Sequence, residues 1–368
     1  MALHNYWWLL IWLFLFGGIS LAFIPRQEEY VLGERCVRWS WFAAIILVLP
    51  FVIWAGWRTD SFGDTGMYRM TFNQMPVGLA QMPEYISGLT KDRGFSIFEY
   101  LFKTLISRES TAFFFLVAAI QMLCLVCVYR KYSRNFWLSI FLFIASTDYL
   151  SWMFNGVRQF LAAALIFAAL PLLVKRKYIL MVLVVLIASQ IHTSALIFLP
   201  FIIIVNGRAW NIRTLAFIFS ITLAVLFLDR VTGVITGALE DTAYEGDIMY
   251  FNSEVDNGTN IFRVLFYSVP AVLAWIFRPY LYKANDPMIN VCANLSIVAA
   301  CVYVFSYFTS GIIVGRLPIY FSLANYILIP WLIGEVLDSV SAVFISTVFV
   351  GVYTVFFYIQ LHLGWGMI

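Results

Sequence analysis

Charged residues are scarce in this sequence of 368 residues. Asp, Glu, Lys and Arg make up only 12% of it, whereas hydrophobic residues make up 62% and the mean hydropathy is +0.88. A soluble domain uses roughly a quarter charged residues to cover its surface, so most of this surface must face something other than water. The formal net charge of +3 is also too small to indicate a nucleic-acid partner.

The motifs of metal sites and soluble enzymes are missing as well. The chain has only three histidines and five cysteines. Cys124 and Cys127 form a CxxC, but they lie inside an apolar run, so we interpret them as membrane-embedded residues rather than a redox or metal pair. There is no P-loop, HExxH or GxSxG pattern. We therefore expect neither a metal ion nor a cofactor.

Long apolar segments are what the sequence has instead. Crossing a bilayer takes about 20 apolar residues in a helix. The sequence therefore predicts an all-α, polytopic integral membrane protein with about twelve transmembrane helices in a single domain over residues 1–368. The expected segments are 5–24, 38–57, 111–129, 136–150, 157–174, 178–190, 193–206, 214–229, 263–277, 288–308, 317–334 and 341–361.

Segments 178–190 and 193–206 could form one long tilted helix or two short ones that break near Gln190-Ile191-His192. The distribution of basic residues favours two helices. With both termini outside, the short inner loops then hold a majority of the 23 basic residues, as the positive-inside bias requires. These inner residues are Arg26, Arg35, Arg38, Arg130, Lys131, Arg134, Lys175, Arg176, Lys177, Arg208, Arg213, Arg278 and Lys283.

Two outer loops are much longer than the others. Loop 58–110 contains the stretch from Phe95 to Phe102, whose apolar spacing predicts an amphipathic helix at the membrane interface. Loop 229–262 is acidic and is either a solvated lid or a binding surface. The acidic residues of this second loop are Glu240, Asp241, Glu245, Asp247, Glu254 and Asp256.

Ionisable and amide side chains near membrane depth are the candidates for chemistry. On one helix, Asn155, Arg158 and Gln159 would share a face. A guanidinium beside two amides suits a phosphate, which the planar fork can bind through two hydrogen bonds. The alternative is that Arg158 only reaches toward the interface from a helix end.

Three further places carry polar groups. His192 lies in a polar break within an apolar stretch and could act as a base near neutral pH. The stretch from Arg58 to Arg69 combines carboxylates and arginines with glycines that allow a tight turn. Arg316 opens a helix on the outer side, where a lone arginine is often only an interfacial anchor.

In its motifs the sequence resembles the EpsG/Wzy family of bacterial polysaccharide polymerases. The resemblance covers roughly residues 40–210. It rests on four stretches, of which the last two are the most specific: Arg58-Thr59-Asp60 through Asp64 and Tyr68, Gly94-Phe95-Ser96-Ile97-Phe98-Glu99-Tyr100, Asn155-Gly156-Val157-Arg158-Gln159, and Ile191-His192-Thr193-Ser194-Ala195. Either Asp60 or Asp64 corresponds to the acid of the family's first motif.

The resemblance implies a metal-independent membrane glycosyltransferase of the C-type class. Such proteins join repeat units carried on undecaprenyl diphosphate at the outer, periplasmic face of the bacterial cytoplasmic membrane, in some systems with a chain-length regulator protein as partner. Applied to this chain, it implies catalytic roles for His192 and Asp64. Diphosphate binding falls to Arg158, Arg316 and Arg58, and substrate positioning to Asn155, Gln159, Asp60, Tyr68 and Arg69.

Three other functions remain open from the sequence. An O-antigen ligase-like transferase would share the same arginine and histidine chemistry. A lipid-linked oligosaccharide flippase should show polar residues along a path through the membrane and some repeat symmetry, whereas the polar residues here gather in the outer half. An envelope acyltransferase would also use a histidine near a helix start.

Overall fold

The computed structural model describes residues 5–23, 26–239, 245–251 and 255–366. They divide into two compact units. The first comprises residues 1–168, 187–193 and 337–368, and the second comprises residues 169–186 and 194–336. Helices dominate both units, and the only sheet among the described residues is a two-stranded hairpin in the first unit.

The first unit consists of long helices, the hairpin and a group of short helices. Its elements are α1 (Trp7–Phe23), β1 (Arg26–Val31), β2 (Glu34–Trp39), α2 (Trp41–Gly56), α3 (Thr65–Gln74), η1 (Leu79–Gln81), α4 (Met82–Ser87), α5 (Arg93–Leu105), α6 (Ser110–Tyr132), α7 (Phe136–Ala145), the π-helix η2 (Tyr149–Asn155), α8 (Val157–Ala168), α19 (Ser339–Tyr358) and η6 (Ile359–Gly364).

The second unit holds the remaining helices. They are α9 (Leu170–Val174), α10 (Tyr178–Ile191, whose last residues belong to the first unit), η3 (Thr193–Ile197), α11 (Phe198–Ile204), α12 (Ile212–Leu226), α13 (Leu228–Leu239), η4 (Glu245–Phe251), α14 (Ile261–Ile276), α15 (Arg278–Ala284), α16 (Pro287–Phe308), η5 (Val314–Arg316), α17 (Ile319–Ser322) and α18 (Asn325–Val336).

Among the described residues, four helices are long and apolar enough to cross a membrane, or up to eight if each bent pair of helices is one span. The four are Ser110–Tyr132, Val157–Val174, Pro287–Phe308 and Ser339–Gly364. Four shorter apolar helices fall in the other expected segments, namely 5–24, 38–57, 178–190 and 193–206. The apolar helices thus agree with an all-α membrane protein, whereas the expected twelve crossings are not confirmed.

Short polar side chains fix where several of these helices begin. Asn135, Asn211 and Asp286 each accept hydrogen bonds from backbone N–H groups in the first turn of α7, α12 and α16. Such caps satisfy donors that have no partner inside the helix. The predicted break near His192 is confirmed as well, because α10 ends at Ile191 and a 3₁₀ turn begins at Thr193.

The hairpin of β1 and β2 is a departure from the all-α expectation. Its strands pair antiparallel from Arg26 with Trp39 to Val31 with Glu34. The two turn residues, Leu32 and Gly33, both have positive φ, 53° and 92°, as a two-residue hairpin turn requires. The glycine is the sequence signal for this turn, and the high charge of the segment made it look like an ordinary loop.

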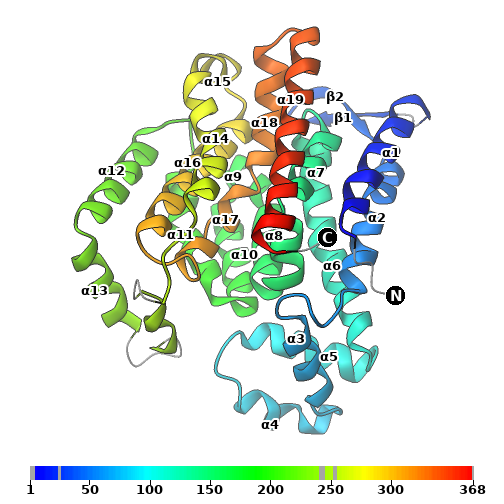
Figure 1. Cartoon of the computed structure of the whole chain (residues 1–368), viewed down its shortest axis with the longest axis vertical. Coiled ribbons are helices and arrows are strands. Elements are labelled where there is room, and N and C mark those ends of the chain that lie inside the picture. Colours follow the sequence, from blue (N-terminus) through cyan, green and yellow to red (C-terminus); the bar gives the residue numbers. More distant parts are fainter. Residues whose placement is uncertain (1–4, 24–25, 240–244, 252–254, 367–368) are drawn as a thin grey trace. The chain divides into compact units, whose positions relative to one another are not determined.

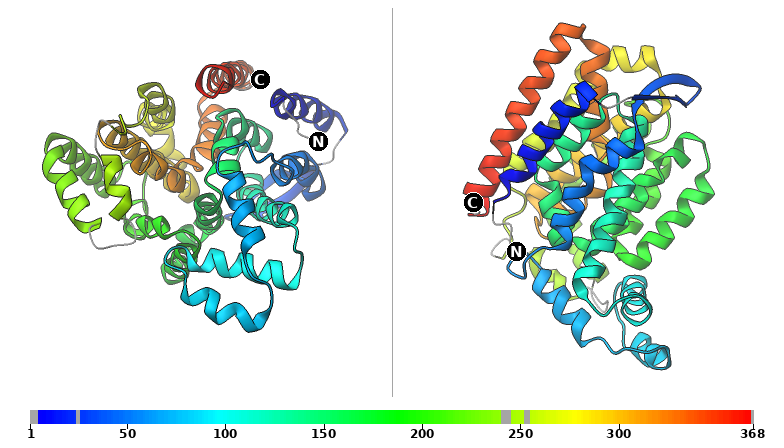
Figure 2. Two further views of the ribbon diagram at one scale, coloured as in Figure 1. Left: turned by 60° about the horizontal axis from the view of Figure 1, so that its bottom comes forward. Right: turned by 90° about the vertical axis from the view of Figure 1, so that its right-hand side faces the viewer.

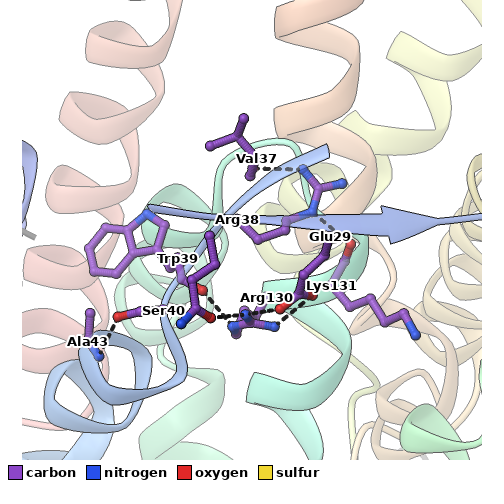
Figure 3. A network of polar contacts seen from close by, with 9 residues as sticks. Glu29, Val37, Arg38, Trp39, Ser40, Ala43, Arg130 and Lys131 are labelled. Atoms are coloured by element: carbon purple, nitrogen blue, oxygen red, sulfur yellow. Dashed lines mark hydrogen bonds and ion pairs between the residues drawn. The ribbon is translucent and has the colours of Figure 1, made fainter. Parts of the chain in front are cut away.

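Arg130, near the end of α6, holds the hairpin against the helices (Figure 3). Its side chain is fully buried and pairs with both carboxylate oxygens of Glu29. Its Nε also donates to the Trp39 carbonyl at 2.6 Å, and its guanidinium lies 4.4 Å from the Trp41 ring centre. Arg38 adds a second bond from the hairpin, to the Lys131 carbonyl at 2.9 Å.

The short helices α3 to α5 lie at the other end of α6 from the hairpin (Figures 1 and 2). An apolar cluster joins α3 and α5 to α6 and α8, and its buried members are Tyr68, Phe72, Phe95, Phe102, Phe113, Phe114, Val117, Val157 and Leu161. Because Val157 and Leu161 flank Arg158 in α8, this cluster fixes α3 and α5 beside that arginine.

In the second unit, α16 packs against α12, α14, α17 and α18 and supports the loop after α11. Asn294, fully buried on α16, donates to the carbonyls of Val205 and Arg208 at 2.9 and 3.1 Å. Its oxygen accepts from the Trp210 N–H at 2.9 Å. The amide thereby satisfies loop backbone groups that no helix pairs, as buried backbone requires.

Candidate functional site

Arg158 lies in the first turn of α8, where two side chains orient its guanidinium. Its Nη1 is 3.1 Å from Oδ2 of Asp92, and its Nε donates to the Tyr68 hydroxyl at 3.2 Å. A third of the Arg158 side chain remains exposed, while Asp92 is buried. The arginine is therefore held in place from one side and still has donors to offer to a ligand.

Asn155 does not lie on the helix of Arg158, so the expectation that Asn155, Arg158 and Gln159 share one helix face is wrong for Asn155. It ends the π-helix η2, and Gly156 separates it from α8. Gln159 is in α8 and is buried. The sequence pattern assumed one continuous helix, whereas this chain changes its helical geometry at Gly156.

The Asn155 side chain instead fixes the turn before α3. Its Oδ1 accepts from the N–H of Asp64 at 3.2 Å. Gly63 lies against the same oxygen with a φ of 51°, and a Cβ there would come within 2.6 Å of it. Asp64 precedes α3 without forming a side-chain capping bond. Asn155 thus positions Asp64 and leaves its carboxylate uncommitted to the helix start.

The contacts of Arg58 are structural. It is buried, donates to the Met153 carbonyl and lies 4.2 Å from the Phe114 ring centre. Burial lowers its pKa to about 10. The charge of Arg58 is thus enclosed among aromatic rings, which makes it a weaker candidate for diphosphate binding than the partly exposed Arg158.

Arg69 also has a structural role, and Asp60 is one of its partners. Its Nε donates to Asp60 Oδ1 at 2.5 Å and its Nη2 to the Arg58 carbonyl at 3.2 Å. Its Nη1 reaches the hydroxyls of Ser110 and Thr111 at 3.4 and 3.2 Å. Every nitrogen of this guanidinium has a partner, so Arg69 ties the turn after α2 to the start of α6.

Asp92 connects Arg158 to the turn that carries His192. Its Oδ1 accepts from the Thr193 N–H at 3.2 Å, while its other oxygen faces Arg158. Asp92 has a φ of 49°, a left-handed conformation that costs energy for most residues and that aspartate tolerates better. His192 itself is half-buried. One carboxylate therefore joins two predicted site regions that are far apart in sequence.

Gly94 makes this junction possible. A Cβ at position 94 would lie 2.6 Å from the Gln190 Cβ and 2.7 Å from its carbonyl oxygen. Real Cβ atoms do not approach backbone so closely, so only glycine lets the start of α5 touch the end of α10. The glycine of the second family-like motif thus has a structural explanation.

Helix α5 covers the stretch where an amphipathic helix was expected, and two neighbouring stripes along it are buried. Phe95 and Phe102 pack in the apolar cluster. Beside them, Asp92, at the start of the helix, and Glu99 and Lys103 form a polar stripe that is also buried. Lys103 Nζ donates to three carbonyls at the end of α3, those of Phe72, Asn73 and Met75, at 2.6, 2.9 and 2.6 Å.

Glu99 is a site residue that the sequence interpretation missed, and Asp92 is another. Glu99 is 4% exposed, and burial raises its pKa to about 7, an effect that Arg158 and Lys103 oppose only in part. The spacing of Asp92, Glu99 and Lys103 on one helical stripe was visible in the sequence. The sequence interpretation placed an amphipathic helix here at the membrane interface and assigned no role to its charged residues.

Arg316 belongs to the second unit and is exposed. Its loop is fixed by Asp256, from the acidic loop 229–262. This carboxylate accepts from the Ser310 hydroxyl at 2.7 Å and from the Ile312 N–H at 2.8 Å. Burial acts to raise the pKa of Asp256, but these and other hydrogen bonds together outweigh it and lower the pKa. Of the other acidic residues in that loop, Glu240, Asp241 and Glu254 lie outside the described residues.

The structure thus brings four polar residues together in the first unit, namely Tyr68, Asp92, Glu99 and Arg158, and Asp92 links them through the Thr193 N–H to the turn of His192. The expectation that Arg316 belongs to the same site as these residues remains a prediction. Within the described ranges, no group of three His, Cys, Asp or Glu residues could hold a metal ion.

Comparison with known proteins adds one finding. The family model of the EpsG family matches residues 41–364, which covers every residue of the candidate site. Searches of curated proteins and of solved structures gave no match.

Proposed function

This chain belongs to the EpsG family of Wzy-like polysaccharide polymerases, and from this premise we propose that it joins lipid-linked glycan repeat units. In the proposed reaction, a repeat unit on undecaprenyl diphosphate is transferred to a sugar hydroxyl of a second lipid-linked unit. The reaction takes place at the outer face of the bacterial cytoplasmic membrane. The acceptor hydroxyl and the donor diphosphate must then meet beside the same residues.

The observation that supports this proposal most is the setting of Arg158. Its guanidinium is oriented by Asp92 and Tyr68 and remains partly exposed. In the reaction, the bond between the sugar carbon and the phosphate oxygen breaks, and the electron pair leaves with the diphosphate. A fixed guanidinium stabilises that charge without having to reorganise, and its fork can bind two phosphate oxygens.

The acceptor hydroxyl gives up its proton as its oxygen bonds to the sugar carbon. His192 and Asp64 are the proposed bases, since an imidazole or a carboxylate placed within hydrogen-bond reach of the hydroxyl can take its proton as the new bond forms. Diphosphate leaves readily, so the mechanism needs no general acid. It also needs no metal ion, because arginine supplies the positive charge. Arg316 and Arg58 are proposed to add to the positive field around the diphosphate.

Reconstitution tests the proposal directly. The purified chain is placed in liposomes with the undecaprenyl-diphosphate-linked repeat unit extracted from the source cells, and the products are separated by length. We expect a ladder of products that differ by one repeat unit, formed equally well with EDTA. Translocation of the repeat unit without coupling, or transfer only to a lipid core, would contradict the proposal.

Gly94→Ala is expected to reduce chain formation about 100-fold, since a shift of about 1 Å at a reacting site can have an effect of this size. The added methyl group has no room beside Gln190, so the start of α5 must move and carry Asp92 away from Thr193. The measurement is the rate of ladder formation in the same liposomes. Gly88→Ala is the matched control, because a Cβ there meets only the Tyr85 carbonyl at an ordinary 3.6 Å. Equal rates in the two variants would show that the junction is unimportant.

A further inference from the structure

Glu99 is a buried carboxylate without a bonding partner. It is 4% exposed, and it neither accepts a hydrogen bond nor forms an ion pair with any residue that the structure describes. The fully buried side-chain atoms that lack a hydrogen-bond partner do not include the Glu99 oxygens, so part of the carboxylate remains accessible. An accessible carboxylate that makes no bond within the protein can accept a hydrogen bond from a ligand.

Lys103 does not neutralise Glu99 directly. The two residues are one helical turn apart on α5, where a salt bridge would be common. The three protons of Lys103 Nζ instead point to the carbonyls of Phe72, Asn73 and Met75. Lys103 thus stabilises the end of α3, and the carboxylate of Glu99 keeps its capacity to accept hydrogen bonds.

Two further groups lie close enough to Glu99 to affect its charge, one from the site and one from α4. Arg158 of α8 and Tyr85 of α4 both interact electrostatically with it. Tyr85 is half-buried and stacks on Tyr100, with ring centres 4.9 Å apart. A carboxylate beside an accessible aromatic ring suits a sugar, which offers hydroxyl donors and an apolar face.

We infer that Glu99 marks the acceptor half of the site, where its ionised carboxylate accepts a hydrogen bond from a hydroxyl of the acceptor sugar. The inference rests on the proposed function and names the place of its second substrate. Charge separates the two halves: the diphosphate of the donor is attracted to Arg158 and repelled by Glu99, whereas a neutral glycan hydroxyl is not.

The ionisation of Glu99 gives this role a pH dependence. The charged and titratable groups around it are Arg158, Tyr85 and Lys103. From α3, Tyr68 lies beside Arg158. Since the pKa of Glu99 is about 7, the carboxylate is ionised above that pH. Acceptor binding should therefore be strongest above pH 7 and weaken as the pH falls through it.

The raised pKa of Glu99 also predicts how the stability of the fold depends on pH. A carboxyl whose pKa is higher in the folded than in the unfolded chain opposes folding once it must ionise. This cost is absent below the unfolded pKa, grows between the two pKa values and is complete above the folded pKa of about 7. Glu99→Gln removes the charge at nearly the same size, so it should raise the unfolding temperature at about pH 8. Loss of binding in this variant would then not be a sign of misfolding.

The test measures binding of the free oligosaccharide, released by mild acid from the lipid-linked repeat unit, to the purified chain. At about pH 8 we expect Glu99→Gln to raise its dissociation constant at least about tenfold, as loss of a hydrogen bond to a charged group does. Binding of undecaprenyl diphosphate should not weaken, because the variant removes a charge that repels it. Lowering the pH to about 6 should weaken oligosaccharide binding in the wild type and leave Glu99→Gln unchanged.

Glu84→Gln is the matched control, since Glu84 is an exposed carboxylate on the neighbouring helix α4. The inference is overturned if the wild type does not bind the oligosaccharide or if Glu99→Gln binds it as tightly. It is also overturned if Glu99→Gln loses undecaprenyl diphosphate equally, because Glu99 would then act on Arg158. If oligosaccharide binding depends on Glu99 but the protein forms no polymer, the acceptor site is supported and the proposed polymerase function is rejected.

Discussion

Arg158→Ala is expected to lower the rate of polymer formation by about 100- to 1,000-fold, the usual effect of removing one donor that stabilises developing negative charge. Asp92 and Tyr68 orient the guanidinium of Arg158, and a third of its side chain remains exposed to a ligand. Arg158→Lys should also be poor, because an ammonium group cannot form two parallel bonds to a phosphate. The measurement is the rate of ladder formation in liposomes at equal protein content.

Two controls make this result specific. Arg108→Ala removes an exposed arginine that lies just before α6, and this variant should leave the rate unchanged. Tyr68→Phe removes only the hydroxyl that accepts from Arg158 Nε and should have an intermediate effect. Chains of normal length made by Arg158→Ala at normal protein level would refute the assignment of the diphosphate to this residue.

Arg130→Met is expected to lower the free energy of unfolding of the first unit by about 1.5–3 kcal/mol, the range found for loss of hydrogen bonds to a charged group. Arg130 is 1% exposed and its partner Glu29 is 30% exposed. Methionine would fill part of the volume but leave Glu29 and the Trp39 carbonyl without their donors. The hairpin should then separate from α6.

The unfolding temperature in detergent and the amount of chain in the membrane measure this loss. Lys131→Met, at the next position, should change neither, because the hairpin contacts the backbone carbonyl of Lys131 and not its ammonium group. Arg130→Met should keep its catalytic rate per folded molecule, since its side chain bonds only to the hairpin and the start of α2. An unchanged unfolding temperature would mean that the network adds nothing to stability.

Hydropathy was a sound guide to where helices form. Each expected apolar segment contains a helix, and the polar break at His192 is a real helix end. The count of spans was less predictable, because apolar length does not show where a helix bends. Residues 136–155, for instance, form two helices at 68° to each other, and the sequence showed only one apolar run followed by polar residues.

The site was predictable only in part, because the use of an arginine depends on distant partners. Arg58 and Arg158 look alike in the sequence, yet Arg58 is enclosed by Phe114 and the Met153 carbonyl, and Arg158 is not enclosed. Glu99 and Asp92 were overlooked for the opposite reason. Local spacing put them on a polar stripe, and only tertiary packing turns that stripe toward Arg158.

The hairpin has a consequence for how this family can vary. The range matched by the family begins at residue 41, directly after β2, so Glu29 and Gln27 lie outside it while Arg130 lies inside. The partners that neutralise and bond Arg130 thus come from a segment that lies outside the range matched by the family model. A relative without the hairpin would enclose an uncompensated cation if it kept the arginine. Across the family, arginine at this position and a hairpin ahead of α2 should therefore be gained and lost together.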